Sequence, residues 1–316
     1  MHQKKPSVNI IILNWNGIDD TLECLDSVSK LTYPNVTTVV VDNGSGNNEA
    51  ARIAETYPSV IVLPQTENLG FCGGCNVGIN YALDHGADYV MLLNNDTLVP
   101  PDIIDKLFAG IEDLENVGAI SPVILEYPET KKIWFSDARW VPEEAQFRLA
   151  RPDDKYEEVS SRGPFTTQFA CGCCMFVSVD VLKKVGLLDE RYFAFYDEAA
   201  WCAEAHSKGF ESYVVPTAVV YHKVSRSTPA LVSTYLLTRN RMLWMKENLP
   251  FGTRIKSFPY LLREVGWHWA NILGLTRRNH YSKAHSKAVL HGYRDYLRRK
   301  FFRWSGASEK AIFSDM

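Results

Sequence analysis

The chain has 316 residues, of which 46% are hydrophobic and 22% are charged, and its formal net charge is −3. This length and composition predict a folded globular protein with one large or two modest domains, and they exclude a disordered chain. The slightly acidic balance also excludes the overall basic character of a nucleic-acid-binding protein, so no nucleic-acid partner is expected.

The first half of the chain alternates short apolar runs of β-branched residues with stretches of helical periodicity. The predicted strands cover residues 8–13, 36–41, 60–63 and 88–93. The predicted helices cover residues 18–28, 50–54, 73–83 and 103–108, and Asp19 or Asp20 is expected to cap the first. Repeated strand–helix units with short links predict a mainly parallel sheet with helices on both faces.

The rest of the chain is read in two parts. Residues 126–167 lose the alternation and predict a loop-and-hairpin insertion. Helical periodicity returns at 178–185, capped by Ser178, and at 198–208, and everything after Pro229 is expected to be helical. No stretch approaches the ~20 apolar residues of a membrane-spanning helix, and the N-terminus lacks a secretion signal, so a cytoplasmic protein is expected.

The C-terminal end is strongly basic. Asp295 is the only acid within a segment that holds the following bases: Arg277, Arg278, Lys283, Lys287, Arg294, Arg298, Arg299, Lys300 and Arg303. A basic end on a mildly acidic body suggests an anionic surface or partner.

Polar residues follow the predicted strands at the points where each strand ends. In parallel sheets, ligands bind at these carboxyl ends, so Asn14, Asn16, Asp42 and the run Asn94-Asn95-Asp96 are expected to line one crevice. Asp96 is a natural ligand for Mg²⁺ or Mn²⁺ together with diphosphate oxygens, and equally a turn-forming residue. Asp42 could accept hydrogen bonds from a nucleobase or a ribose, or simply form a turn.

Two further segments carry possible chemistry. Adjacent Asp197 and Glu198, flanked by aromatic residues at a helix start, are candidates for a general base whose pKa burial would raise; alternatively they complement the helix dipole. His222 follows a strand-like segment and could bind a metal, although a lone histidine is more often structural.

Glycines and cysteines cluster in the segment 67–80. Three of its glycines stand at a helix start and would let a ligand approach the backbone closely. The segment comes too late in the alternation for a dinucleotide-binding loop. Cys72 and Cys75, with Cys171, Cys173 and Cys174, could form a zinc site. Their apolar surroundings favour small buried residues instead.

The order of these motifs resembles the family 2 glycosyltransferases, within them the rhamnosyltransferase-like branch. The resemblance runs from about Val8 to Asn240, with a weaker echo to about Phe301. The matching segments are IIILNWNG, VVVDNGS, ENLGFCGGCNVGI, LLNNDT, FYDEAAWC, YHKVSRS and Thr238-Arg239-Asn240.

The resemblance implies a GT-A fold: a Rossmann-like α/β domain with a mainly parallel central sheet and flanking helices, here with a C-terminal helical extension. Residues 1–125 would bind the nucleotide sugar, 126–227 the acceptor, and 228–316 would form a basic helical segment. That segment would contact an anionic membrane peripherally, at the inner face of the cytoplasmic membrane, or form a lid or a homodimer interface.

The resemblance also implies an inverting, metal-dependent transfer of a sugar from a UDP- or dTDP-sugar, with dTDP-rhamnose among the candidates, to a glycan or lipid-linked glycan hydroxyl. Asp96, with His222, would hold Mn²⁺ or Mg²⁺, and Glu198, or else Asp197, would be the base. Arg239 and Asn240 form a further matching pair. The expected nucleotide-binding residues are Asn14, Asn16, Asp42, Asn68, Gly70, Asn76 and Asn95.

The sequence departs from the family pattern at several positions. Asn94 stands where the metal-binding motif has its first Asp, and the usual Glu-Asp order is reversed in Asp197-Glu198. Ala200 replaces a second Asp, and Glu204 stands where relatives often carry Arg. These departures keep a second hypothesis open, that of a weak or inactive nucleotide-sugar-binding scaffold in a glycan-assembly complex.

Overall fold

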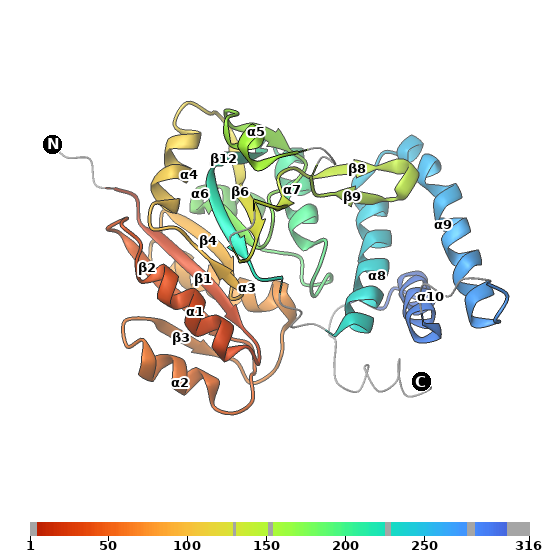
Figure 1. Ribbon diagram of the computed structural model, residues 1–316, viewed down its shortest axis with the longest axis horizontal. Helices are drawn as coiled ribbons and strands as arrows, with labels where there is room; N and C mark the ends of the chain where they lie inside the picture. The colour runs from red at the N-terminus through yellow and green to blue at the C-terminus, as the bar shows by residue number, and fades with distance from the viewer. Residues whose placement is uncertain (1–4, 129–130, 151–153, 225–228, 277–281, 302–316) are drawn as a thin grey trace.

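The computed structural model describes residues 5–128, 131–150, 154–224, 229–276 and 282–301 (Figure 1). Four parallel strands form the first half of a central sheet in the order β3-β2-β1-β4. Their bounds are β1 Val8–Asn14, β2 Val36–Asp42, β3 Ile61–Pro64 and β4 Tyr89–Asn94. The predicted α/β class with a mainly parallel sheet is confirmed.

Helices connect these strands as predicted. They are α1 Ile18–Val28, α2 Glu49–Thr56, α3 Gly70–Asp84 and α4 Ile103–Ile111. The expectation that Asp19 or Asp20 caps α1 is wrong: Gly17 occupies the cap position with no side-chain hydrogen bond, and both aspartates lie in the first turn. There they complement the positive end of the helix dipole instead of accepting a specific backbone hydrogen bond.

The second half of the sheet is mixed. β11 (Cys174–Ser178) runs antiparallel between β4 and β6 (Val117–Glu126), and β12 (Glu211–His222) runs parallel to β6. Short strands complete the sheet: β5 Thr97–Leu98 and β10 Phe165–Thr167 pair with β12, and β7 Ile133–Phe135 pairs with β6. The sequence pattern does not predict the strands β6 and β11.

The irregular middle contains the expected hairpin, formed by β8 (Arg139–Val141) and β9 (Gln146–Arg148) around a 3₁₀ turn at Pro142–Glu144. Helices α5 Tyr156–Ser160, α6 Val179–Val185 and α7 Asp197–Ser207 follow. Ser178 caps α6 as predicted, because its hydroxyl accepts a hydrogen bond from the Val181 N–H.

Three helices lie beside the sheet at the right of Figure 1: α8 Ala230–Asn248, α9 Phe251–Ile272 and α10 Lys283–Leu297. The β8–β9 hairpin reaches them, and the ring of Trp140 packs against that of Trp244 at 5.0 Å between centroids. None of the described helices is both long and apolar enough to cross a bilayer. Arg277, Arg278 and Arg303 of the basic segment lie outside the described residues.

Glycines let α3 pack tightly on β1. A Cβ atom on Gly74 would lie 2.3 Å from Leu13 Cδ1, and one on Gly78 would lie 2.4 Å from Ile11 Cγ2. β1 itself is buried on both faces, which explains the apolar run from Ile10 to Leu13. Two of the four glycines in 67–80, Gly74 and Gly78, therefore serve helix–sheet packing and not ligand approach.

We predict that Gly78→Ala lowers the free energy of unfolding by roughly 1–3 kcal/mol, the usual cost of overpacking a core. Gly252→Ala is the control, because Gly252 is exposed and nothing lies within 4 Å of its Cβ position. Chemical denaturation measures both. Equal stability of the two variants would contradict the packing role.

Candidate functional site

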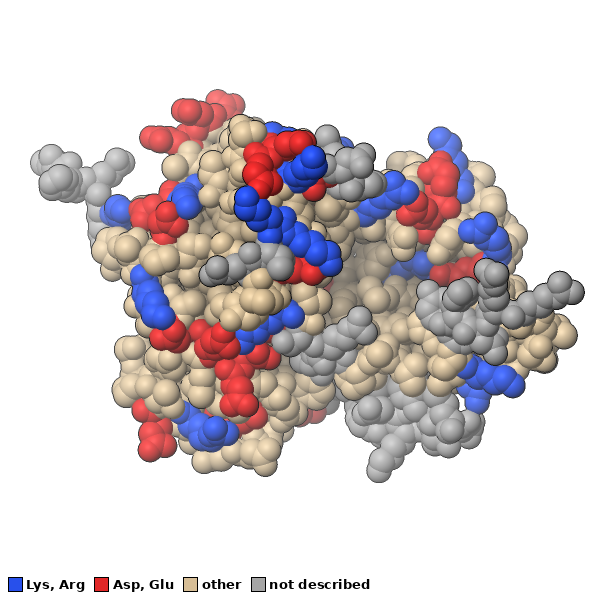
Figure 2. All heavy atoms as spheres, in the orientation of Figure 1, with Lys and Arg blue, Asp and Glu red and all other residues tan. Residues whose placement is uncertain are grey.

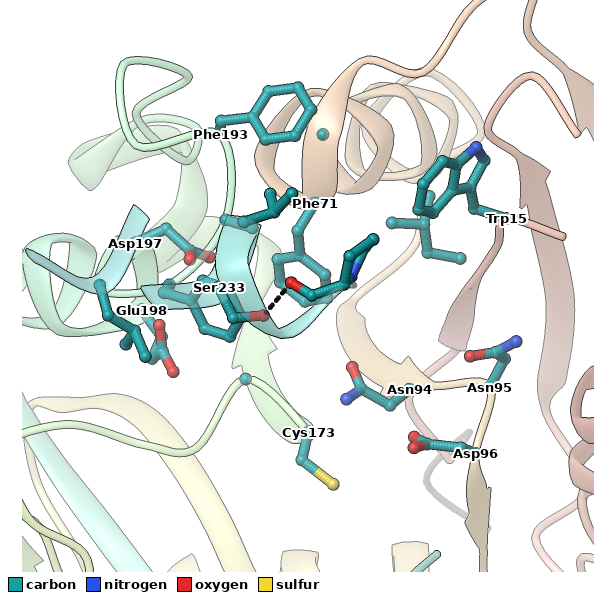
Figure 3. Close-up of a pocket in the computed structure, with 18 of the residues that line it drawn as sticks. Trp15, Phe71, Asn94, Asn95, Asp96, Cys173, Phe193, Asp197, Glu198 and Ser233 are labelled. Atoms are coloured by element: carbon teal, nitrogen blue, oxygen red, sulfur yellow. Dashed lines mark hydrogen bonds between the residues drawn. The ribbon is translucent and has the colours of Figure 1, made fainter. Parts of the chain in front are cut away.

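A cavity of about 750 Å³ opens at the carboxyl ends of β1 and β4. Asn94, Asn95 and Asp96 lie on one side of it, and Asp197 and Glu198 lie on the other (Figure 3). The first residues of α8 and His285 of α10 also line it, so the C-terminal helices complete its wall. The cavity thus joins segments from both halves of the sheet and from the helical extension.

The pairing of β5 with β12 brings Asp96 and His222 together. Thr97 pairs with His222 in this short ladder, and the Lys223 N–H donates to the Asp96 carbonyl at 2.9 Å. The Asp96 carboxylate lies 3.1 Å from His222 Nε2, and each side chain is only 8% exposed. The Trp134 ring packs edge-on against the imidazole at 4.7 Å.

Lys223 fixes the chain just beyond this pair. Its ammonium group forms ion pairs with Asp20, at 2.8 Å, and with Glu23, both on α1. Figure 2 shows the acidic side chains that cover this helix. The end of β12 is therefore anchored to both the sheet and α1, which leaves His222 little freedom to move away from Asp96.

The residues present fit a divalent cation. Adjacent ligands of an octahedral Mg²⁺ ion with bonds of 2.0–2.1 Å lie about 3 Å apart, close to the 3.1 Å that separates the Asp96 and His222 donor atoms. The described residues contain no cluster of three or more His, Cys, Asp or Glu side chains suited to a metal. A cation here would need further ligands from a bound anion or water.

The zinc hypothesis for the cysteines gains no support from this arrangement. All seven cysteines are buried free thiols, and no cluster of metal-binding side chains includes them among the described residues. Burial raises the pKa of the Cys24 and Cys202 thiols to about 12. These thiols are protonated core residues, as their apolar surroundings predict.

Asp197 and Glu198 begin α7 and face the cavity as an adjacent acidic pair. Asp197 is 1% exposed, and its Oδ2 has no hydrogen-bond partner among the described residues. Burial raises the pKa of Asp197 to about 6. Burial, and then repulsion from Asp197, raise the pKa of Glu198 well above its usual value. A carboxylate in this state is a stronger proton acceptor than one in water.

The loop before α7 has an unusual backbone. Phe193, Phe195 and Tyr196 have φ angles of 64°, 70° and 67°, in the left-handed region that residues with side chains rarely adopt. Gly70 makes room for this loop, because a Cβ atom on it would lie 2.5 Å from the Phe193 carbonyl oxygen. Such strained residues persist only where their surroundings hold them.

Asn240 and Arg239 hold this loop from α8. The amide group of Asn240 donates to the carbonyl oxygens of Tyr192, Ala194 and Phe195 at 2.8, 2.7 and 2.9 Å. Arg239 donates to the Tyr192 carbonyl at 3.0 Å. Both residues are buried, and neither lines the cavity. They are positioning residues that fix the start of α7 and hence its acidic pair.

The other residues predicted from the strand ends divide into two groups. Asn14 and Asp42 lie behind the cavity wall in a buried network, where Asn14 donates to Asp42 at 2.8 Å and to Glu49 at 2.9 Å. Asn16 is exposed and accepts a hydrogen bond from the Gly46 N–H. We expected these three residues to line the crevice, but none of them lines this cavity. Their neighbours Leu13, Trp15 and Asn43 line it instead.

Asn68, Gly70 and Asn95 do line the cavity, whereas Asn76 does not. Asn68 accepts from the Gly70 N–H at 2.8 Å, and Asn95 donates to Thr21 at 2.9 Å. The buried amide of Asn76 donates to the Leu188 carbonyl and accepts from the Leu188 N–H, at 2.9 and 3.0 Å. In this structure Asn76 ties α3 to the segment after α6.

Aromatic residues to which the sequence pattern assigns no role in lining the cavity form much of the remaining wall. They are Trp15, Phe71, Trp134, Phe193 and Phe195. Trp15 and Phe71 stand inside recognisable motifs, beside the polar residues that drew attention. Trp134 lies in the irregular middle and had no local signal. These rings give the cavity flat apolar surfaces next to its charged groups.

We predict that Asn240→Ala lowers the free energy of unfolding by about 1–3 kcal/mol, because the partly buried carbonyl oxygens of Ala194 and Phe195 lose their Asn240 donor. It should also speed hydrogen exchange at residues 192–196. Asn248→Ala is the control on the same helix, since the Asn248 amide donates only to the Trp244 carbonyl among the residues that the structure describes. If exchange at 192–196 is the same in both variants, the loop does not depend on Asn240.

A family model described as glycosyl transferase family 2 matches residues 9–186. The chain is 22% identical over 301 residues to the dTDP-rhamnosyl transferase RfbF of Shigella flexneri, covering 91% of this chain and 96% of that protein. It is 25% identical over 248 residues to the N-acetylglucosaminyl-diphospho-decaprenol L-rhamnosyltransferase of Mycobacterium tuberculosis, covering 70% and 77%.

Solved structures share the fold. The mannosyltransferase PcManGT from Pyrobaculum calidifontis, in complex with GDP-Man and Mn²⁺, superposes with a TM-score of 0.56 at 17% identity, covering 94% of this chain and 89% of that one. At this identity the likeness establishes a GT-A fold. With the family match over more than half of its length, the chain belongs to glycosyl transferase family 2, and the two relatives above are named as rhamnosyltransferases.

Proposed function

We propose that this glycosyltransferase moves a deoxyhexose such as rhamnose from a dTDP- or UDP-sugar to a hydroxyl of a glycan or lipid-linked glycan, with inversion at the anomeric carbon. One observation carries the proposal: the Asp96–His222 pair and the Asp197–Glu198 pair face a single cavity. A donor diphosphate on one side and an acceptor hydroxyl on the other would then meet across it.

The similarities support the choice of donor and acceptor. One relative is named as a dTDP-rhamnosyl transferase, and another as acting on a diphospho-decaprenol acceptor. In our proposal the nucleotide lies along residues 1–125, where Asn68, Gly70 and Asn95 line the cavity, and the acceptor lies along residues 126–227. The aromatic wall offers flat surfaces on which a sugar ring can pack.

Asp96 and His222 are the residues that would hold Mn²⁺ or Mg²⁺. When bound, the cation would supply Lewis-acid stabilisation of the negative charge that develops on the leaving diphosphate. The two side chains are almost inaccessible to solvent and held in place, which strengthens their electrostatic interactions within the cavity. Asn94 lines the same wall and offers a neutral amide where the family motif has a carboxylate.

Glu198 is the proposed base. It takes the proton from the acceptor hydroxyl as that oxygen bonds to the anomeric carbon and the bond from this carbon to the donor phosphate oxygen breaks. The nucleoside diphosphate leaves with the bonding electrons, and a single displacement inverts the anomeric centre. Asp197 assists by raising the pKa of Glu198, so that the carboxylate is a better proton acceptor.

We expect Asp96→Asn to abolish turnover and to remove the Mn²⁺ dependence of nucleoside-diphosphate binding, because an amide is a weaker ligand than a carboxylate. Asp113→Asn, an exposed site after α4, matches the change in charge and should behave as wild type. Calorimetric titration with and without Mn²⁺, beside a donor-turnover assay, measures both. Full activity of Asp96→Asn would refute the metal assignment.

We expect Glu198→Gln to bind donor normally and to lose about 10²–10⁴-fold in kcat, the usual contribution of a general base. Asp197→Asn should keep transfer. If Asp197→Asn loses transfer instead, the base is Asp197. If wild type binds nucleotide sugar without transferring it to any acceptor hydroxyl or to water, the inactive-scaffold hypothesis replaces this one.

The pH dependence follows from the same pair. The base accepts a proton only when it is ionised, and the pKa of Asp197 is raised to about 6 and that of Glu198 well above its usual value. We expect kcat/KM to rise with pH through and above about 6. In Asp197→Asn the neighbouring charge is gone, so this rise should move to lower pH. An unmoved profile would show that the two carboxyl groups are not coupled.

A further inference from the structure

Helix α9 carries a continuous apolar stripe that faces away from the protein. Five large apolar side chains of α9, and that of the residue after its last turn, lie along one side at spacings of three, four and seven residues, and all six are 55% to 71% exposed. They are Phe251, Ile255, Phe258, Leu262, Trp269 and Leu273. At 1.5 Å per residue, the stripe runs for roughly 33 Å along the helix.

The orientation of this stripe is fixed by the opposite face of α9. Leu261, His268 and Asn271 are buried there, and Asn271 donates to Ser286 of α10 at 2.9 Å. Glu264 bonds Arg241 of α8 and Tyr293 of α10. The helix therefore cannot turn its apolar side inward without breaking a buried ion pair and several buried hydrogen bonds.

The charges on α9 are of one sign on its accessible surface. Its bases are Arg254, Lys256 and Arg263, and its only acid, Glu264, is already bonded to Arg241. Arg254 also acts electrostatically on Tyr296 together with Arg299, so the basic end of α10 lies near the start of α9. An apolar stripe edged with bases is typical of a helix that lies in the headgroup region of an anionic bilayer.

The opposite face of α9 contacts a helix that lines the cavity. His268, next to Trp269, lies beside His285 with 5.9 Å between ring centroids, and His285 lines the cavity. A surface that docked on α9 would therefore be near the helices that complete the wall of the site. The position of the stripe suits an acceptor that is held in a membrane.

We propose that the apolar stripe of α9 docks in plane on a bilayer rich in anionic phospholipid, with Lys256 and Arg263 contacting lipid phosphates. A second copy of the chain is a poorer occupant, because pairing two α9 faces would bring bases together with no free acid on either helix. This inference does not depend on the identity of the sugar, the metal or the base.

The test uses the full chain and extruded vesicles of phosphatidylcholine, with or without phosphatidylglycerol. Wild type should co-sediment with the anionic vesicles and be released by salt. Phe258→Ser combined with Leu262→Ser should weaken this binding at least about tenfold without changing the melting temperature, because both side chains are exposed. Leu187→Ser, an exposed apolar residue after α6, is the matched control and should bind as wild type.

The contribution of basic residues and the depth of α9 in the bilayer are tested separately. Arg263→Gln should weaken binding about fivefold on anionic vesicles only, the effect of about one unit of charge near such a surface. Lipids brominated on the acyl chain should quench tryptophan emission in wild type, and less so in Trp269→Phe, which still binds.

Several results would overturn the proposal. One is that wild type ignores anionic vesicles, and another is that the Phe258→Ser/Leu262→Ser variant binds them as tightly as Leu187→Ser does. A third is that sedimentation equilibrium finds a wild-type dimer that the double variant splits, since the stripe would then belong to a second copy. The experiment measures vesicle binding, so a negative result would not contradict the proposed sugar transfer. In the same way, a lack of sugar transfer would not contradict vesicle binding.

Discussion

The pairing of two short backbone segments is the constraint on which the site depends. β5 has only two residues, yet its ladder with the end of β12 brings a side chain from position 222 to within 3.1 Å of one at position 96. The Lys223 ion pairs to α1 lock the same junction from the other side. Without this junction the cavity would have an acidic wall, but Asp96 would have no second side chain beside it to bind a cation.

The far wall of the cavity depends on a different kind of constraint. The loop of residues 192–196 is held in left-handed conformations by donors from α8, a helix that begins after the sheet is complete. The C-terminal helices are thus part of the site in two ways: they line the cavity, and they fix the backbone that presents Asp197 and Glu198. If α9 rests on a bilayer, the same helices also set the distance between the cavity and the membrane.

Much of the fold could be predicted from sequence because its signals are local. The β1, β2 and β4 strands each contain a short run of apolar residues, and the Ser178 cap follows from a single side chain. β11 was missed because its neighbours on both sides are antiparallel partners distant in sequence, which no local period reveals. The predicted cap of α1 was wrong because the sequence of an acidic first turn does not show whether an aspartate caps the helix.

The site was predictable where a residue's role follows from its place just after a strand or at the start of a helix. Asp96 and Glu198 were expected in one cavity, and they line one. Asn14 and Asp42 also end strands, but their side chains form hydrogen bonds within a buried network. The sequence alone does not show in which direction the side chain at the end of a strand points. The aromatic wall depends on residues such as Trp134, whose position is set by the tertiary fold.

The most direct test of the account is a crystal soaked with Mn²⁺ and a nucleoside diphosphate, measured by anomalous scattering at the manganese edge. The account predicts one anomalous peak that contacts both the Asp96 carboxylate and the His222 imidazole, with the diphosphate bound beside it in the cavity that Glu198 lines. A peak away from these two side chains, or a diphosphate bound outside the cavity, would contradict it.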